Sequence, residues 1–190
     1  MTASATTLTP SSATDLGEDH LPSRPASITA LMAVQTLRST VIRPTLTFLG
    51  VNLLAAENLV LGTLLATSRL PLECRLANAI GPFAIPTELH TELWDGYLAQ
   101  QPDQASLIRG LASQHCFLQN PHAELGYNLA YATAIAWLIY QRQGVCLHPQ
   151  ATLAELSRIW QTAYPHRGGR AVDFMDAWAS ASASELLFTA

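Results

Sequence analysis

The sequence predicts a mainly α-helical protein with a single domain. The chain has 190 residues, which suits one domain and is short for two. Apolar residues recur at helical spacing over long stretches, whereas the alternating pattern of strands is scarce. Hydrophobic residues make up 49% of the chain and charged residues only 13%, about half the usual share. We therefore expect much of the surface to be buried, in a core or against partners.

The first 27 residues differ in composition from the rest of the chain. They hold ten Ser or Thr residues and three prolines, with almost no large apolar side chains. Such a segment cannot bury enough surface to offset the entropy lost on ordering. We expect an extended or disordered N-terminal arm over residues 1–27, a helical domain over 28–180 and a C-terminal tail over 181–190. In an assembly, the arm would lie on a neighbouring subunit.

Capping residues and helix breakers divide the domain into elements. Ser27 is placed to cap a helix that Pro44 would end, and Asn52 is placed to cap the next one. A proline-rich stretch that contains Gly81 predicts an irregular or hairpin-like segment over residues 71–86. The helices expected in chain order cover residues 28–41, 53–69, 87–100, 102–115, 121–143, 152–163 and 171–180.

Charge and cysteine content exclude several classes of protein. All ten basic residues are arginines, and fourteen acidic residues leave a net charge of −4, so nucleic-acid binding through phosphate neutralisation is not expected. Cys74, Cys116 and Cys146 form no CxxC pair, which favours buried thiols in a reducing compartment. The apolar runs at 59–66 and 132–140 are too short to span a membrane, and no signal peptide is predicted.

Residues that carry chemistry are sparse. There is no GxSxG or HExxH motif and the histidines are dispersed, so we expect no metal site and no cofactor. Hydrolysis of a sugar bond needs paired carboxylates, but Glu73 and Glu88 are typical of solvated or helix-capping acids. Aromatic residues at helical spacing, Trp94 among them, favour a core over a sugar-binding cleft.

Four segments resemble, in the same order and spacing, a group of bacteriophage proteins related to lysozymes and soluble lytic transglycosylases. The match would cover roughly residues 41–178, and each motif is short. The resemblance implies a lysozyme-like helical domain. The segments are VIRPTLTFLGVNLLAAENLVLGTLLATS at 41–68, GPFAIPTELHTELWDGYL at 81–98, LIRGLASQHCFLQNPHAELGYNLAYATAIAWLIY at 107–140 and IWQTAYPHRGG at 159–169.

The resemblance also implies where an active site would lie. In that group, the helix that corresponds to the one ending here near residue 68 closes on a Glu-Ser pair, whose Glu is the catalytic acid. A later Gly-x-Phe/Tyr-Gln element lines the sugar cleft. Here Thr67 stands at the position of the acid and Ala84 at that of the glutamine. A threonine hydroxyl cannot donate its proton near neutral pH, which leaves Glu73 as a fallback acid. The residues that look retained are Ser68, Gly81, Phe83, His90 and Trp94.

These features predict a non-catalytic, lysozyme-like structural component of a phage particle, in its tail, baseplate or neck. The expected partners are other virion proteins, in several copies joined through the N-terminal arm, with peptidoglycan as a further ligand. The expected location is the virion, after synthesis in the cytoplasm of a bacterial host. Two alternatives stay open: a virion-associated peptidoglycan hydrolase with Glu73 or Glu88 as its acid, and a non-catalytic glycan-binding module that uses Phe83 and Trp94.

Overall fold

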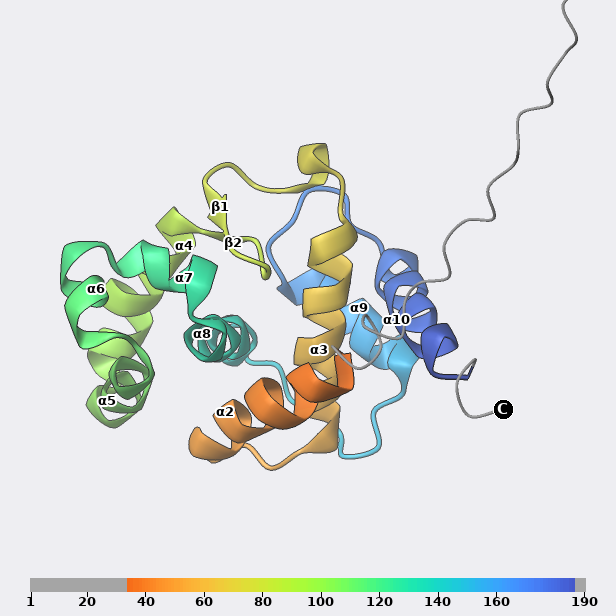
Figure 1. Ribbon diagram of the computed structural model, residues 1–190, viewed down its shortest axis with the longest axis horizontal. Helices are drawn as coiled ribbons and strands as arrows, with labels where there is room; N and C mark the ends of the chain where they lie inside the picture. Colours follow the sequence, from red (N-terminus) through yellow and green to blue (C-terminus); the bar gives the residue numbers. More distant parts are fainter. Residues whose placement is uncertain (1–33, 187–190) are drawn as a thin grey trace, which may run out of the picture.

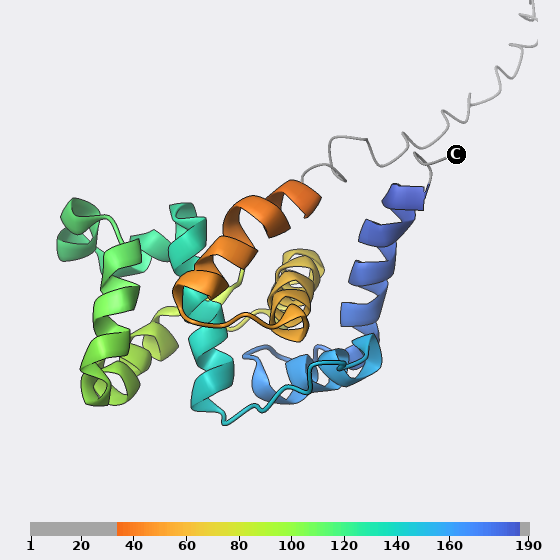
Figure 2. The same ribbon diagram turned by 90° about the horizontal axis from the view of Figure 1, so that it is seen from below.

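The computed structural model describes residues 34–186 and confirms a mainly helical fold. Helix α3 lies at its centre, with α8 on one side and α9 and α10 on the other (Figures 1 and 2). The predicted arm over residues 1–27 lies outside the described residues. The elements around the centre are α2 (Arg43–Phe48), α3 (Leu54–Arg69), α8 (Leu129–Arg142), α9 (Leu153–Ala163) and α10 (Ala171–Leu186).

Helix α3 is buried on nearly all sides because apolar residues occupy its whole circumference. Gly62 lets α10 pack closely, since a Cβ at this position would lie 2.0 Å from the ring of Phe174. The acid of the first turn, Glu57, accepts two hydrogen bonds from the guanidinium of Arg43, at 2.9 and 3.0 Å. The largely buried carboxylate of Glu57 is therefore paired with a cation.

The expected hairpin over residues 71–86 is present. A short turn, η2 (Leu72–Cys74), leads into strands β1 (Ala79–Ile80) and β2 (Ile85–Pro86), which pair antiparallel with Ile80 opposite Ile85. The hairpin lies beside the C-terminal end of α3 (Figure 1). Its turn is thus next to the position where the resemblance would put a catalytic acid.

Two boundaries near the start of the domain were predicted wrongly. Pro44 does not end the first helix, because a π-helical turn, η1 (Arg38–Ile42), precedes it and places it in the first turn of α2. A proline is tolerated there because that turn needs no N–H from it. The N-cap of α3 is Leu53 and not Asn52, and no side chain caps it.

The long helix expected over residues 121–143 is broken at Asn128. Its pieces are η5 (Pro121–Ala123), α7 (Glu124–Tyr127) and α8. The Asn128 side chain accepts from the Tyr131 N–H at 3.1 Å and donates to the Glu124 carboxylate at 2.7 Å. The asparagine side chain caps the first N–H groups of the new helix, and this stabilises the break. The effect outweighs the tendency of the apolar neighbours to continue one helix.

The remaining helices follow the expected order with shifted ends, except that the single helix predicted over residues 102–115 is two helices, which end at Leu111 and begin again at Gln114. Helix α9 begins where Thr152 and Glu155 form a capping box. Helix α10 continues to Leu186, six residues past its predicted end. Among the described helices, none has the length and apolar character needed to cross a membrane. The elements of the outer lobe are α4 (Thr87–Glu92), η3 (Leu93–Tyr97), η4 (Leu98–Gln100), α5 (Pro102–Leu111) and α6 (Gln114–Gln119).

Candidate functional site

Thr67 lies in the last turn of α3, and its side chain is buried. Its hydroxyl lies 2.8 Å from the carbonyl oxygen of Thr63, one turn earlier, and 2.8 Å from the carbonyl oxygen of Pro82 in the hairpin. The hydroxyl therefore acts as a donor between the helix and the turn. This position is closed by protein atoms and presents no group to solvent.

The hairpin turn is held from two further sides. Gly81 has a φ of +73°, and a Cβ there would lie 1.9 Å from the carbonyl oxygen of Leu125, so only glycine fits. Phe83 is fully buried, and its carbonyl accepts a hydrogen bond of 2.8 Å from the hydroxyl of Tyr164. Ala84 is buried with a φ of +48°. The ring of Phe83 offers no surface to a sugar in this structure.

The backbone at the end of α3 is capped by an arginine. Arg75 donates to the carbonyl oxygen of Thr67 at 3.2 Å, and that of Ser68 lies 3.5 Å away. The Ser68 side chain is exposed, and its hydroxyl donates back to Leu64 at 2.6 Å. Glu73 is exposed on η2 and makes no hydrogen bond or ion pair with the described residues. We call the contacts of Thr67, Gly81, Pro82, Phe83 and Tyr164 the α3–hairpin junction.

The two other predicted residues, His90 and Trp94, belong to a second group of side chains. His90 is buried, and its Nε2 lies 2.6 Å from the hydroxyl of Tyr131. The indole N–H of Trp94 donates to the same hydroxyl at 2.8 Å. On its other side, the Nδ1 of His90 lies 2.9 Å from the Nδ1 of His122. These four residues form what we call the imidazole cluster.

Burial sets the protonation of the imidazole cluster. Loss of hydration and, to a smaller extent, the neighbouring charge of His122 together lower the pKa of His90 to about 4. Burial also raises the pKa of the Tyr131 hydroxyl well above its usual range. At neutral pH both groups are therefore uncharged, and the hydrogen bond between them joins two neutral groups.

A small apolar pocket of about 240 Å³ opens beside this cluster. The ring of Trp94 is half-buried at its wall and contacts the ring of Phe117 edge-on, with centroids 5.3 Å apart. The other residues that line the pocket are His90, Thr91, Asp95, Pro121 and His122. An aromatic pocket with a carboxylate at its edge is suited to a ring or an apolar group.

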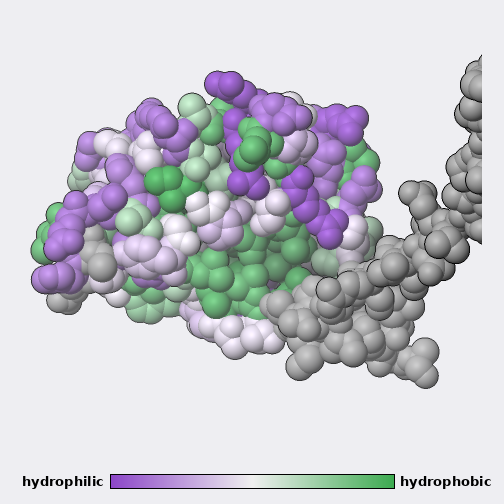
Figure 3. Space-filling model, turned by 45° about the horizontal axis from the view of Figure 1, so that its top comes forward, coloured by the Kyte–Doolittle hydropathy of each residue, from purple (hydrophilic) through white to green (hydrophobic). Residues whose placement is uncertain are grey.

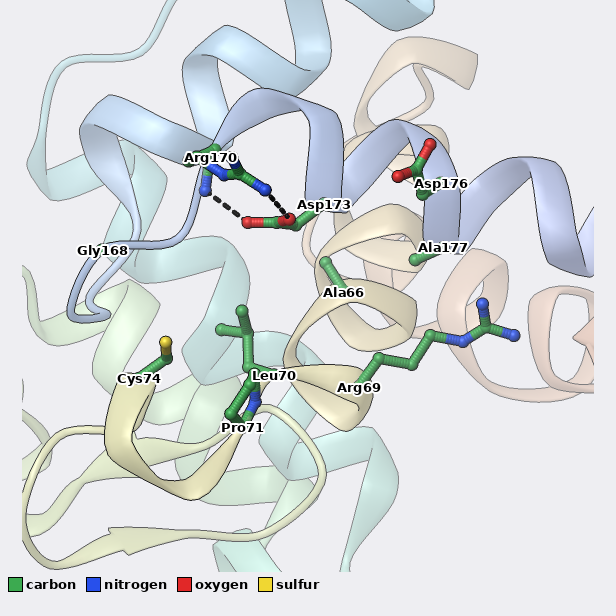
Figure 4. Close-up of a pocket in the computed structure, with 10 residues that line it drawn as sticks. All are labelled: Ala66, Arg69, Leu70, Pro71, Cys74, Gly168, Arg170, Asp173, Asp176 and Ala177. Carbon is green, nitrogen blue, oxygen red and sulfur yellow. Dashed lines mark hydrogen bonds and ion pairs between the residues drawn. The ribbon is translucent and has the colours of Figure 1, made fainter.

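Two larger hollows carry mixed charge. One, of about 340 Å³, lies at the end of α3, where Arg170 and Asp173 form an ion pair of 3.3 Å at the start of α10 (Figure 4). The other, of about 540 Å³, contains Glu88 and a 3.0 Å ion pair between Glu92 and Arg142. Within the described part of the chain, no cluster of His, Cys, Asp or Glu side chains suits a metal ion.

The structure places six of the predicted site residues in two groups, whereas Ser68 and Glu73 are exposed outside both. Thr67, Gly81, Phe83 and Ala84 meet at the α3–hairpin junction, whereas His90 and Trp94 lie in the imidazole cluster. Sequence reasoning missed Tyr131, His122 and Tyr164 as partners. Tyr131 and Tyr164 follow the helical spacing of core residues, and only the positions of distant helices reveal their hydrogen bonds.

Comparison of the chain with protein-family models, with curated proteins and with solved structures found no match. Inferences about function therefore rest on the geometry of these two groups and on the resemblance of the four sequence segments.

Proposed function

We propose that this chain is a non-catalytic, lysozyme-like structural component of a phage particle, which acts through contacts with other virion proteins. The resemblance of the four segments to bacteriophage proteins is the reason to propose a phage particle. The geometry of the α3–hairpin junction supports the absence of catalysis. The remaining support comes from the acids that lie near the junction and from the composition of the surface.

The observation that carries the proposal is the use of Thr67. Its hydroxyl is buried and donates to backbone carbonyl oxygens, including that of Pro82. A general acid needs a titratable proton and a path to the leaving group. Thr67 has neither, because its alkoxide is inaccessible near neutral pH and protein atoms surround it. The position serves to hold the hairpin on the helix.

Neither fallback acid has the environment of a proton donor. A catalytic carboxylic acid needs a pKa raised by burial. Glu88 is exposed, and a hydrogen bond of 2.8 Å from the amide of Asn78 lowers its pKa, so it is ionised at neutral pH. Glu73 is also exposed and lies on η2, outside the α3–hairpin junction. These acids fit a solvated surface better than a sugar cleft.

The surface is suited to contacts with other proteins. The chain has few charges, and Figure 3 shows a continuous hydrophobic area in the lower centre of one face. Several large apolar side chains are also exposed, with Leu72 at 81% and Leu118 at 78%. Large exposed apolar areas are typical of interaction surfaces. Contact with partners would remove these side chains from water.

Two measurements test the proposal. The full chain, added at high concentration to a peptidoglycan suspension, should leave the turbidity unchanged, whereas an active lysozyme clears it. Mass spectrometry and electron microscopy of purified particles of the encoding phage should find the chain in several symmetric copies. Clearing that is lost in Glu73→Gln or Glu88→Gln, or particles that lack the chain, would overturn it.

Glycan binding without catalysis is the second candidate, and the half-buried ring of Trp94 favours it. This ring lies in the wall of an open apolar pocket, where it could stack on a sugar. Titration with soluble peptidoglycan fragments should then perturb the Trp94 indole N–H signal. Trp94→Ala should abolish binding, whereas Trp178→Ala, on the distant helix α10, should leave it unchanged.

A further inference from the structure

The imidazole cluster has one donor whose direction is certain. The indole nitrogen of Trp94 can only donate a hydrogen bond. It lies 2.8 Å from the Tyr131 oxygen and 3.2 Å from Nε2 of His90. The nearer Tyr131 oxygen accepts this N–H, and Nε2 of His90 also faces it. This assignment determines where every other proton of the cluster lies.

The hydrogen bond between Tyr131 and His90 fixes the position of the proton on His90. The Tyr131 hydroxyl is fully buried, and among the described residues its only acceptor is Nε2 of His90, at 2.6 Å. The hydroxyl therefore donates to Nε2, and the single proton of neutral His90 is on Nδ1. That Nδ1–H points at Nδ1 of His122, 2.9 Å away, which must be unprotonated. Neutral His122 consequently carries its proton on Nε2.

A second proton on His122 is incompatible with this chain of hydrogen bonds. It would bind Nδ1 and set two N–H groups against each other across 2.9 Å. Nδ1 of His90 could accept a hydrogen bond from His122 only if the proton of His90 moved to Nε2. The new Nε2–H would then face the Tyr131 hydroxyl and the Trp94 N–H. Three donors would then meet inside the buried part of the cluster, with no acceptor for one of them.

We propose that the hydrogen bond between His90 and His122 is a proton-operated latch, which holds the two sides of the apolar pocket beside Trp94 together at neutral pH and releases them on acidification. The bond joins α4 to η5, and both histidines line the pocket. Phe117, from the neighbouring helix α6, also lines the pocket and contacts the ring of Trp94. This inference does not depend on the proposed function.

The surrounding charges decide which histidine takes the proton. The hydrogen bond from Asn78 is the main cause of the lowered pKa of Glu88 on α4, and a positive charge on His122 makes the smallest contribution in the same direction. A charge on His122 disfavours one on His90, whose pKa is lowered to about 4. His122 is half-buried whereas His90 is buried, so solvent reaches the ring of His122 more readily. The other charged or titratable groups nearby are Asp95 on η3, Arg109 on α5, Glu124 on α7 and Tyr131 on α8, with the exposed His115 on α6.

Nitrogen-15 NMR of the histidine rings in the full chain tests the latch directly. At pH about 8, well above the usual pKa of an imidazole, His90 should carry its proton on Nδ1 and His122 on Nε2. As the pH falls to about 5, His122 should gain its second proton, and the indole N–H signal of Trp94 should shift with the same midpoint. A proton on Nε2 of His90 at pH about 8 would overturn the proposal.

Two variants separate the latch from general effects of pH. His122→Gln offers an acceptor that cannot be protonated, so the Trp94 indole signal should not move between pH about 7.5 and 5, the range in which imidazoles usually titrate. His115→Gln should keep the response of the original chain. An unchanged response in His122→Gln would contradict the latch. If that variant does not fold, the ring spectra of the unmodified chain decide the matter.

Discussion

The α3–hairpin junction and the imidazole cluster were expected to form one cleft, but they differ in kind. The junction is joined by hydroxyl groups that donate to backbone carbonyl oxygens, from Thr67 to Pro82 and from Tyr164 to Phe83. None of these groups titrates near neutral pH. In the cluster, two imidazoles are hydrogen-bonded to each other, and both line a pocket. The first region therefore keeps the same charge near neutral pH, whereas the second contains imidazoles that can gain protons.

The largest expected effect is at the turn of the junction. Gly81→Ala puts a Cβ 1.9 Å from the carbonyl oxygen of Leu125 at a φ of +73°. We expect a loss of about 3 kcal/mol or more in the free energy of unfolding, since strain and a backbone clash combine. Urea unfolding measures it. Gly110→Ala, whose Cβ would meet nothing within 4 Å, is the control and should be neutral or slightly stabilising.

The next effect distinguishes the cluster by its dependence on pH. The pKa of His90 is about 4 in the folded chain, against about 6.5 in the unfolded chain. Because the unfolded chain binds the proton more tightly, this residue's contribution is complete above pH about 6.5 and is lost as the pH falls towards 4. The difference between the two pKa values corresponds to about 3 kcal/mol in the free energy of unfolding.

Unfolding experiments in urea at a series of pH values measure this slope. His90→Gln should flatten it between pH about 6.5 and 4, whereas His115→Gln should not. A slope that is unchanged in His90→Gln would show that the charge of this residue is tolerated in the folded chain, and the contrast between the two regions would fail.

A smaller effect tests the hydroxyl of the junction. Thr67→Val keeps the shape of the side chain and removes the donor to Pro82, which should cost about 1 to 2 kcal/mol at any pH. Thr67→Ser should recover most of the loss because it restores the hydroxyl. Thermal unfolding at pH about 5 and about 8, on either side of the usual pKa of an imidazole, compares the two variants. If the difference in stability between the two variants changed with pH, the junction would depend on protonation as the cluster does.

The smallest effect concerns Tyr164. Tyr164→Phe removes its hydrogen bond to the Phe83 carbonyl but keeps the ring against that of Tyr140, tilted by 33° with centroids 5.5 Å apart. We expect a loss of about 1 kcal/mol in the free energy of unfolding, measured in urea. A much larger loss would mean that this bond, and not the burial of Phe83, holds the turn in place.

Local signals predicted much of the fold. The capping pair Thr152 and Glu155 begins α9, and Pro71 follows directly after the helix end at Leu70, as expected. The break at Asn128 was missed because it depends on Glu124 and on the carbonyl of Leu111, which lies 17 residues away in the chain. Apolar periodicity carries no information about such partners.

The candidate site was predictable only in part, for the same reason. His90 and Trp94 are four residues apart on one helical path, so their proximity follows from the sequence. Their partners His122 and Tyr131 come from other elements, 32 and 41 residues from His90, and no local pattern pairs them. The substitution at Thr67 could be recognised from the resemblance, but its bond to Pro82 required the position of the hairpin.

The clearing of peptidoglycan is the measurement that tests the central claim most directly, namely that Thr67 serves structure and not catalysis. The full chain should leave the turbidity of a peptidoglycan suspension unchanged over hours, and Thr67→Val should behave in the same way. Clearing by the unmodified chain that is lost on Glu73→Gln or Glu88→Gln would contradict the account, because it would show that an acid outside the junction performs the hydrolysis.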